Sequence, residues 1–321
     1  MIYLLTLDVF TLTHFPIDHP TLLETICNRS QKQLYKTDEI FRQKNDRQTL
    51  SEYLSTMKGK EKRESKRFLK YVVVDGVEVD VRSLRKALNL DSEEGDASSS
   101  VNQRAIIETL CAKSPERLVA ARELYERLFD ANFLETLQSS LASDPVLAII
   151  VTALVSHNRQ EIMERTDWED GSPESLVEEI EGMLVEPTPD NLQELAMTFL
   201  THSLDQMKLI AQLYESTHHK NLEREITKKI PGLVGVALNS FTLDRAPFLA
   251  RQIHDSISDP DTINRLIGGS DKPLLAEVKK VYESHFRADL MVDIANAYPT
   301  APEYVAYVTS WTTAPGFPST A

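Results

Sequence analysis

Apolar residues recur at intervals of three and four along most of this 321-residue chain. This spacing places the apolar side chains on one face of a helix, because an α-helix has about 3.6 residues per turn. Only ten glycines and fifteen prolines interrupt the pattern. Strand-like patterns are confined to residues 5–12 and 71–74, and both stretches are short enough to be buried helix as well. The pattern predicts a nearly all-α protein.

Four segments of the chain align with one another. Each ends in an aromatic residue: Phe41, Tyr125, Tyr214 or Tyr282. Each also carries a serine between two predicted helices, at Ser30, Ser114, Ser203 or Ser270. Successive serines are 84, 89 and 67 residues apart, and successive aromatic residues are 84, 89 and 68 apart. Two independent markers agree to within one residue, which indicates an internal repeat.

Each aromatic residue is followed by two more predicted helices. The first is short and covers residues 50–57, 133–140, 222–229 and 290–296. The second is apolar and covers residues 68–74, 146–155, 233–238 and 304–311. A further amphipathic stretch can open each copy, most clearly at 80–88, where Asp80 is a suitable N-cap. The sequence therefore predicts five helices per copy.

These copies define four predicted repeats. They cover residues 1–77, 78–160, 161–240 and 241–311. The acidic stretches at 91–100 and 161–190 are expected to be extra length between helices, and residues 312–321 are expected to be a disordered tail. Residues 1–15 are a poor amphipathic helix, so the first helix of repeat 1 is the least regular.

Charge and cysteine content narrow the class of protein. The chain has 35 Lys+Arg against 49 Asp+Glu, a net charge of -14, which opposes binding to nucleic acid. Cys27 and Cys111 are too few for a disulfide framework and lie on apolar helix faces, which favours a cytoplasmic protein. The N-terminus lacks the basic region and cleavage site of a signal peptide, and no apolar run is long enough to span a bilayer. Any membrane contact is expected to be peripheral.

The sequence carries no motif for catalysis or for a dedicated metal site. It has no G-x-S-x-G, no phosphate-binding glycine loop and no H-E-x-x-H. His218 and His219 lack further ligands at metal-binding spacing, and the acidic loop 91–96 does not match a twelve-residue calcium loop. We therefore predict a protein that is not an enzyme, with no catalytic residues and no cofactor.

Two phrases resemble the annexin family. Leu-Arg-Lys-Ala-Leu at 84–88 precedes Ile-Ile-Glu-Thr-Leu at 106–110, and Leu-Ala-Arg-Gln-Ile-His-Asp at 249–255 is similar to the opening helix of the family's last repeat. The resemblance covers nearly the whole chain and implies four five-helix repeats packed into a curved disc. In annexins the loops between helices A and B and between helices D and E lie on the convex face, where calcium bridges the protein to anionic phospholipid.

The resemblance also implies what a calcium site needs. Ca²⁺ takes six to eight oxygens, and in annexins a Gly-x-Gly-Thr turn and a D–E carboxylate supply them. Here the A–B turns read Phe15-Pro16-Ile17, Ser99-Ser100-Val101, Thr188-Pro189-Asp190 and Ile257-Ser258. The D–E carboxylate position aligns with Met57, Leu141, Lys229 and Ala297. We therefore assign no metal ligands and expect any calcium binding to be weak.

Positive charge gathers where this alignment places the D–E turns. Residues 58–70 carry a local charge of +5. The basic residues there are Lys58, Lys60, Lys62, Arg63, Lys66, Arg67 and Lys70. Repeat 3 adds Lys228 and Lys229. Each basic residue near an anionic leaflet contributes about 1 kcal/mol, although a solvated helix face gives the same pattern.

The resemblance and this charge predict a peripheral protein that binds anionic phospholipid membranes, with basic D–E loops replacing calcium. One alternative is a protein-interaction scaffold, cytoskeletal or vesicle-associated, that binds no lipid. The other is ordinary calcium-dependent phospholipid binding, with Asp144, Glu186 or Asp190 as the nearby carboxylates.

Overall fold

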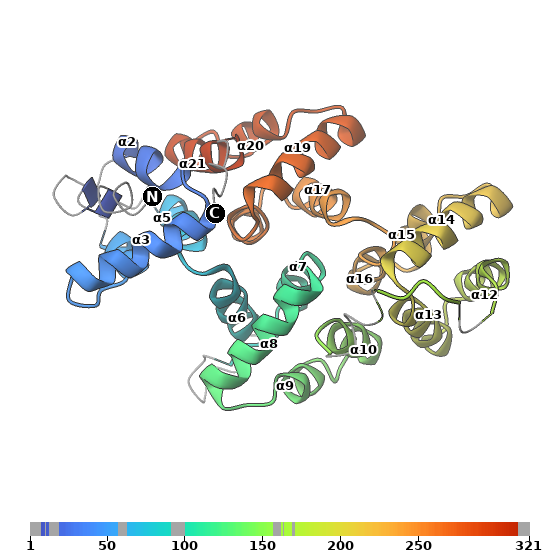
Figure 1. The fold of residues 1–321 in the computed structure, drawn as a ribbon. Coiled ribbons are helices and arrows are strands. Elements are labelled where there is room, and N and C mark those ends of the chain that lie inside the picture. The colour runs from blue at the N-terminus through green and yellow to red at the C-terminus, as the bar shows by residue number, and fades with distance from the viewer. Residues whose placement is uncertain are drawn as a thin grey trace. The chain divides into compact units, whose positions relative to one another are not determined.

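The computed structural model describes residues 8–9, 11–12, 19–56, 63–90, 100–156, 162, 164–168 and 171–313. All regular secondary structure in these ranges is helical, and they contain no β-strand (Figure 1). Residues 71–73 belong to a helix rather than a strand, because their apolar side chains continue the helical face of the preceding residues. The prediction of an all-α protein is confirmed.

The helices follow the predicted five-helix plan, and we use the letters A to E for their order within a repeat. In repeat 1, after the helical residues 8–9 and 11–12, they are α2 (His19–Leu22) continued by η1 (Leu23–Cys27), α3 (Gln31–Lys44), α4 (Leu50–Ser55) and α5 (Arg63–Val73). In repeat 2 they are α6 (Gly76–Ala87), α7 (Gln103–Cys111), α8 (Pro115–Phe129), α9 (Phe133–Ser140) and α10 (Pro145–Leu154).

Repeats 3 and 4 have the same plan. In repeat 3 the helices are α12 (Pro173–Val185), α13 (Pro189–Thr201), α14 (Leu204–His218), α15 (Leu222–Lys229) and α16 (Leu233–Asn239). In repeat 4 they are α17 (Arg245–Asp255), α18 (Pro260–Ile263) continued by η2 (Asn264–Gly268), α19 (Lys272–Phe286), α20 (Leu290–Ala297) and α21 (Pro302–Thr313).

Helix C begins in the same way in every copy. Ser30, Ser114 and Ser203 are its N-caps in the first three repeats, and each side chain accepts a hydrogen bond from the backbone N–H three residues later. In repeat 4 the N-cap is Asp271 rather than Ser270. From cap to buried aromatic residue the distance is then eleven residues in all four copies, which removes the one-residue mismatch between the two markers.

Three local predictions are wrong. Asp80 is buried in the interior of α6, and the N–H groups of Val77 and Glu78 are capped by Asp75 instead (2.9 and 3.2 Å). The stretch 161–190 contains helix α12, which Ser172 caps ahead of a proline at the first helical position. Helix α21 extends to Thr313, so the first two residues of the predicted tail are helical.

The chain divides into two compact units. One consists of Met1–Asp80 with Leu249–Ala321, and the other of Val81–Phe248. The centre of each unit is built from helices B and E of two repeats: η1, α5, η2 and α21 in the first, and α7, α10, α13 and α16 in the second. These helices carry many of the buried apolar side chains, among them Val72, Ile107, Ile150 and Trp311, so packing them together buries apolar surface.

Helix B differs between the two units. In the first unit its second half widens to a π-helix, as η1 and as η2, whereas α7 and α13 of the second unit are α-helical throughout. Gly268 ends η2 against α5, and a Cβ atom there would lie 2.8 Å from the Cβ of Tyr71. Only glycine permits this close approach.

Candidate functional site

The A–B turn of repeat 3 uses its polar groups within the turn. Thr188 caps α13 by accepting a hydrogen bond from the Asn191 N–H (3.2 Å). The Asn191 side chain in turn donates to the Glu186 carbonyl (2.7 Å). A cation at that carbonyl would have to compete with the amide of Asn191, although the side chains of Glu186 and Asp190 are exposed to solvent.

The A–B turn of repeat 4 is also closed by its own side chains. Asp259 accepts hydrogen bonds from the Asp261 N–H through Oδ1 (3.1 Å) and from the Thr262 hydroxyl through Oδ2 (2.7 Å). Both carboxylate oxygens of Asp259 therefore serve to begin α18. The A–B turn of repeat 1 and residue 99 of repeat 2 lie outside the described residues.

The D–E turns offer no carboxylate at the aligned positions. Leu141 is fully buried, while Lys229 and Ala297 are the last residues of α15 and α20. Asp144 caps α10, and its Oδ1 accepts a hydrogen bond from the Leu147 N–H (3.1 Å). Met57 lies outside the described residues. Across the described ranges, no three His, Cys, Asp or Glu side chains are grouped as a metal ion would require.

The basic cluster of repeat 1 is only partly described. Lys58, Lys60 and Lys62 lie outside the described residues. Arg63, Lys66, Arg67 and Lys70 are on α5, where Arg63 is exposed and the other three are half-buried. Arg63, Lys66 and Lys70 have no hydrogen-bond or ion-pair partner among the described residues.

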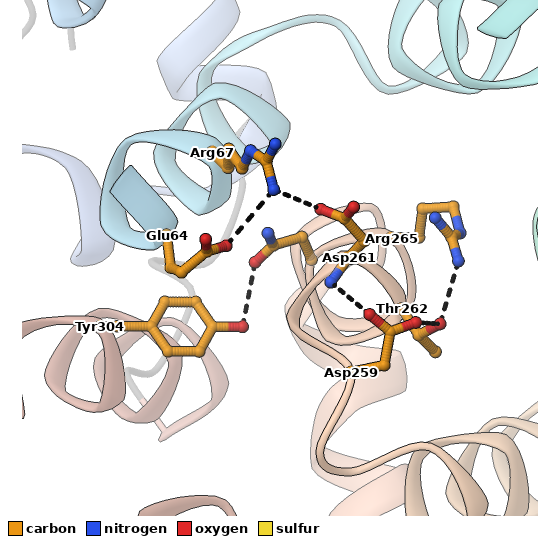
Figure 2. A network of polar contacts seen from close by, with 8 residues as sticks. Glu64, Arg67, Asp259, Asp261, Thr262, Arg265 and Tyr304 are labelled. Carbon is orange, nitrogen blue, oxygen red and sulfur yellow. Dashed lines mark hydrogen bonds and ion pairs between the residues drawn. The ribbon is translucent and has the colours of Figure 1, made fainter. Parts of the chain in front are cut away.

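Arg67, by contrast, lies in a polar network with repeat 4. Figure 2 shows its guanidinium between two carboxylates, Asp261 Oδ1 at 3.1 Å and Glu64 Oε2 at 3.7 Å. On the repeat 4 side, the Tyr304 hydroxyl donates to Asn264 Oδ1 (3.1 Å). The network joins α5 to α18, η2 and α21, so Arg67 has a structural role that its sequence context does not reveal.

The carboxylates of this network affect the neighbouring phenols. Burial raises the pKa of Tyr298, and the negative charges of Asp259, Glu64 and Asp261 raise that pKa further. Burial likewise raises the pKa of Tyr304. Both hydroxyls therefore stay protonated near neutral pH, which keeps Tyr304 a hydrogen-bond donor to Asn264.

Lys228 and Lys229 are placed differently. They occupy the last turn of α15 at the D–E turn of repeat 3, and both are exposed. Neither has an ion-pair or hydrogen-bond partner in the part of the chain that the structure describes. Cations are favourable at a helix C-terminus, so these charges are tolerated there without a side-chain partner and remain open to a ligand.

The two cysteines are buried, as predicted from the apolar helix faces. Burial raises the pKa of each thiol to about 12. A thiol with such a pKa is almost entirely protonated at neutral pH and is a poor nucleophile. Cys27 and Cys111 are therefore packing residues.

Solved structures of known proteins share this arrangement of helices. No family model matches the chain. Its fold matches that of alpha-14 giardin in the calcium-bound form (TM-score 0.80, 13% identity, 96% of this chain and 99% of that chain). It also matches chicken annexin V in complex with Zn²⁺ (TM-score 0.77, 16% identity, 96% and 95%) and annexin III (TM-score 0.73, 15% identity, 96% and 93%). The chain thus has the fold of annexins and giardins.

Sequence similarity points the same way. Annexin D3 of Arabidopsis thaliana is 26% identical over 266 residues, which cover 78% of this chain and 76% of Annexin D3. Together, the similar sequence and the shared fold support the assignment of this chain to the annexin family. No helix in the described ranges combines the length and apolar character needed to cross a membrane.

Proposed function

We propose that this chain is an annexin-like peripheral protein that binds anionic phospholipid membranes, with the calcium dependence weak or lost. The observation that carries the proposal is the pair Lys228 and Lys229, exposed and without a partner among the described residues, at the D–E position where annexins have a carboxylate. A cation at this position repels calcium but attracts a lipid phosphate or carboxylate directly.

The relatives supply the calcium-dependent alternative. The structure of alpha-14 giardin is calcium-bound. In this chain two of the nearby carboxylates have other partners: Asp144 caps a helix and Asp259 closes its own turn, whereas the side chains of Glu186 and Asp190 are exposed. Calcium would have to displace the bonds of Asp144 or Asp259, and at the Glu186 carbonyl it would compete with the amide of Asn191, which favours weak binding over an ordinary calcium site.

The basic residues of α5, in the other compact unit, form a second proposed lipid contact. Arg63, Lys66 and Lys70 have no partner among the described residues, whereas the charge of Arg67 is offset by Asp261 and Glu64. Arg67 therefore contributes less to lipid binding than its neighbours. Lys58, Lys60 and Lys62 belong to this second proposed contact on the sequence pattern alone.

The proposal includes a cytoplasmic protein without catalytic activity. It predicts binding that depends on salt, because exposed charges are screened over a Debye length of about 8 Å at physiological ionic strength.

The experiment is co-sedimentation with phosphatidylserine vesicles, in EGTA and in millimolar calcium, at low and at physiological salt. Wild-type protein is expected to bind in EGTA and to be released as salt rises. Lys228→Glu/Lys229→Glu should weaken binding at least tenfold. The control is Lys279→Glu/Lys280→Glu, which reverses two adjacent lysines within α19, away from any D–E turn. Because Lys279 lies 3.8 Å from Glu283, the stability of this variant is measured alongside its binding. Equal loss in both variants, or binding only with calcium, would contradict the proposal.

A protein-interaction scaffold is the second candidate. Two large apolar side chains near the ends of helices A and D are exposed, Val185 at 64% and Val292 at 55%. Together with the net charge of -14, they favour a protein partner if vesicles bind in no condition. A saturable partner whose binding is lost in Val185→Ser would then identify this function.

A further inference from the structure

The turn between helices C and D in repeat 1 differs from the other three copies. Helix D begins nine residues after Phe41, but eight residues after the equivalent aromatic residue in repeats 2, 3 and 4. The other copies end helix C with one left-handed residue, namely Asp130, His219 or Arg287. Repeat 1 has two in succession, Asp46 (φ 48°) and Arg47 (φ 66°). One residue has therefore been added to this turn.

The charge of the turn is also reversed. The residue after the aromatic is Glu126, Glu215 or Glu283 in the other copies, and Arg42 in repeat 1. Over the six residues after the aromatic, repeat 1 carries +2, whereas repeats 2, 3 and 4 carry -1, 0 and 0. A chain with a net charge of -14 thus concentrates positive charge at the one turn that has been lengthened.

These residues line a shallow depression that is wide open to solvent, and the side chains of Arg42, Gln43, Lys44, Asp46 and Arg47 are all exposed. The wall is fixed by local bonds. Arg42 is paired with Asp38 (2.6 Å), and the Arg47 N–H donates to the Arg42 carbonyl (3.0 Å).

The helix C-terminus alone does not explain this arrangement. Its dipole favours Arg42 and Lys44, which lie in the last turn of α3. It does not account for Arg47, which follows the helix in a left-handed conformation that is costly for a residue other than glycine. The other three copies also have one left-handed residue other than glycine after helix C, so the distinctive feature of repeat 1 is the second such residue, Arg47.

We propose that this C–D turn depression binds a ligand carrying two or more phosphate groups. Arg47 presents a planar guanidinium group that can bind phosphate oxygens in pairs, Lys44 adds a point charge and Gln43 an amide donor. Arg42, whose guanidinium already pairs with Asp38, contributes less. The carboxylate of Asp46 opposes the anion, so a single phosphate binds weakly. The chemistry is shared by soluble inositol polyphosphates and by phosphoinositide headgroups. The depression uses none of the D–E residues of the proposed membrane contacts.

The test is titration calorimetry with inositol hexakisphosphate at physiological salt. Lys44→Gln/Arg47→Gln should raise the Kd at least tenfold. The control, Lys32→Gln/Lys36→Gln, removes the same charge from exposed positions on the same helix and should change the Kd less than twofold. Deletion of Arg47, which restores the turn length of the other copies, should also weaken binding at least tenfold. The proposal would be overturned if inositol hexakisphosphate did not bind the wild-type protein, or if the control variant lost as much affinity as Lys44→Gln/Arg47→Gln.

Vesicles distinguish the source of the phosphates. If vesicles containing phosphatidylinositol bisphosphate bind wild type but not Lys44→Gln/Arg47→Gln, the ligand is a headgroup. If this variant binds vesicles normally but not inositol hexakisphosphate, the ligand is soluble. Binding of phosphatidylserine vesicles by the same variant should be unchanged, which separates this site from the lysines of α15.

Discussion

Two basic regions of this protein, α5 and the end of α15, look alike in sequence but differ in their surroundings. Arg67 on α5 contacts carboxylates of two helices, one of them 194 residues further along the chain. Lys228 and Lys229 end α15 in solvent, without a partner among the described residues. A basic residue whose charge is already offset helps to hold the fold, whereas one without a partner can attract a ligand.

The comparison implies that changes around α5 alter the stability of the protein, and that changes at the end of α15 alter its binding to membranes.

The largest expected effect on stability is at Gly268, where η2 packs on α5. Gly268→Ala should destabilise the protein by about 1–3 kcal/mol, since a Cβ would meet Tyr71 in a filled site. Unfolding in urea measures this loss of stability. Gly182→Ala, in α12 with no atom within 4 Å, should stabilise by up to about 1 kcal/mol. Equal effects of the two changes would refute close packing at Gly268.

The next largest effect on stability is expected from removing the hydroxyl of Tyr304. Tyr304→Phe should cost about 1–2 kcal/mol, because the fully buried Asn264 loses its donor. Tyr298→Phe is the matched control, since the buried Tyr298 hydroxyl has no hydrogen-bond partner among the described residues. That variant should be neutral or slightly more stable in the same urea measurement. Similar losses in both would mean that the Tyr304–Asn264 bond adds nothing.

A smaller effect is expected at Arg67. Its side chain is 36% exposed and that of Asp261 is 50% exposed, so their pairing is screened by water. A double-mutant cycle with Arg67→Gln and Asp261→Asn should give a coupling of about 0.5 kcal/mol that falls with salt. Binding of phosphatidylserine vesicles by Arg67→Gln should stay within twofold of wild type. A tenfold loss of vesicle binding would show instead that Arg67 contacts the lipid.

The smallest effect on stability is expected at α15. Lys228→Gln/Lys229→Gln should change the free energy of unfolding by less than about 0.5 kcal/mol, because both side chains lie in solvent. The same variant should bind phosphatidylserine vesicles several-fold more weakly. A clear loss of stability would show that these lysines support the helix end instead.

Much of the helical plan could be predicted from the sequence, because it depends on local signals. The bounds of α9 and α15 agree with the prediction at both ends, where an asparagine N-cap precedes an apolar residue. The predicted start of α6 was wrong, because Asp75 and Asp80 are both suitable N-caps and only the packing of the folded chain decides between them.

Contacts made by the folded chain were not predictable in this way. Nothing near Arg67 in sequence indicates Asp261 as its partner, and the charge pattern alone therefore grouped Arg67 with its unpaired neighbours. The widening of helix B at η1 and η2 has no periodic signal either. The lengthened C–D turn of repeat 1 could have been found by counting residues between aligned helices.

The division of the chain into two units bears on how the protein is made. Residues 81–248 are contiguous and can bury their shared centre as soon as they leave the ribosome. The other unit needs both parts of the chain: Lys272 donates to the Cys27 carbonyl, and the Cys27 thiol contacts the Tyr307 carbonyl. Until α21 has been synthesised, the apolar faces of η1 and α5 lack their partner and are exposed to chaperones, so the first helices translated are among the last to become stable.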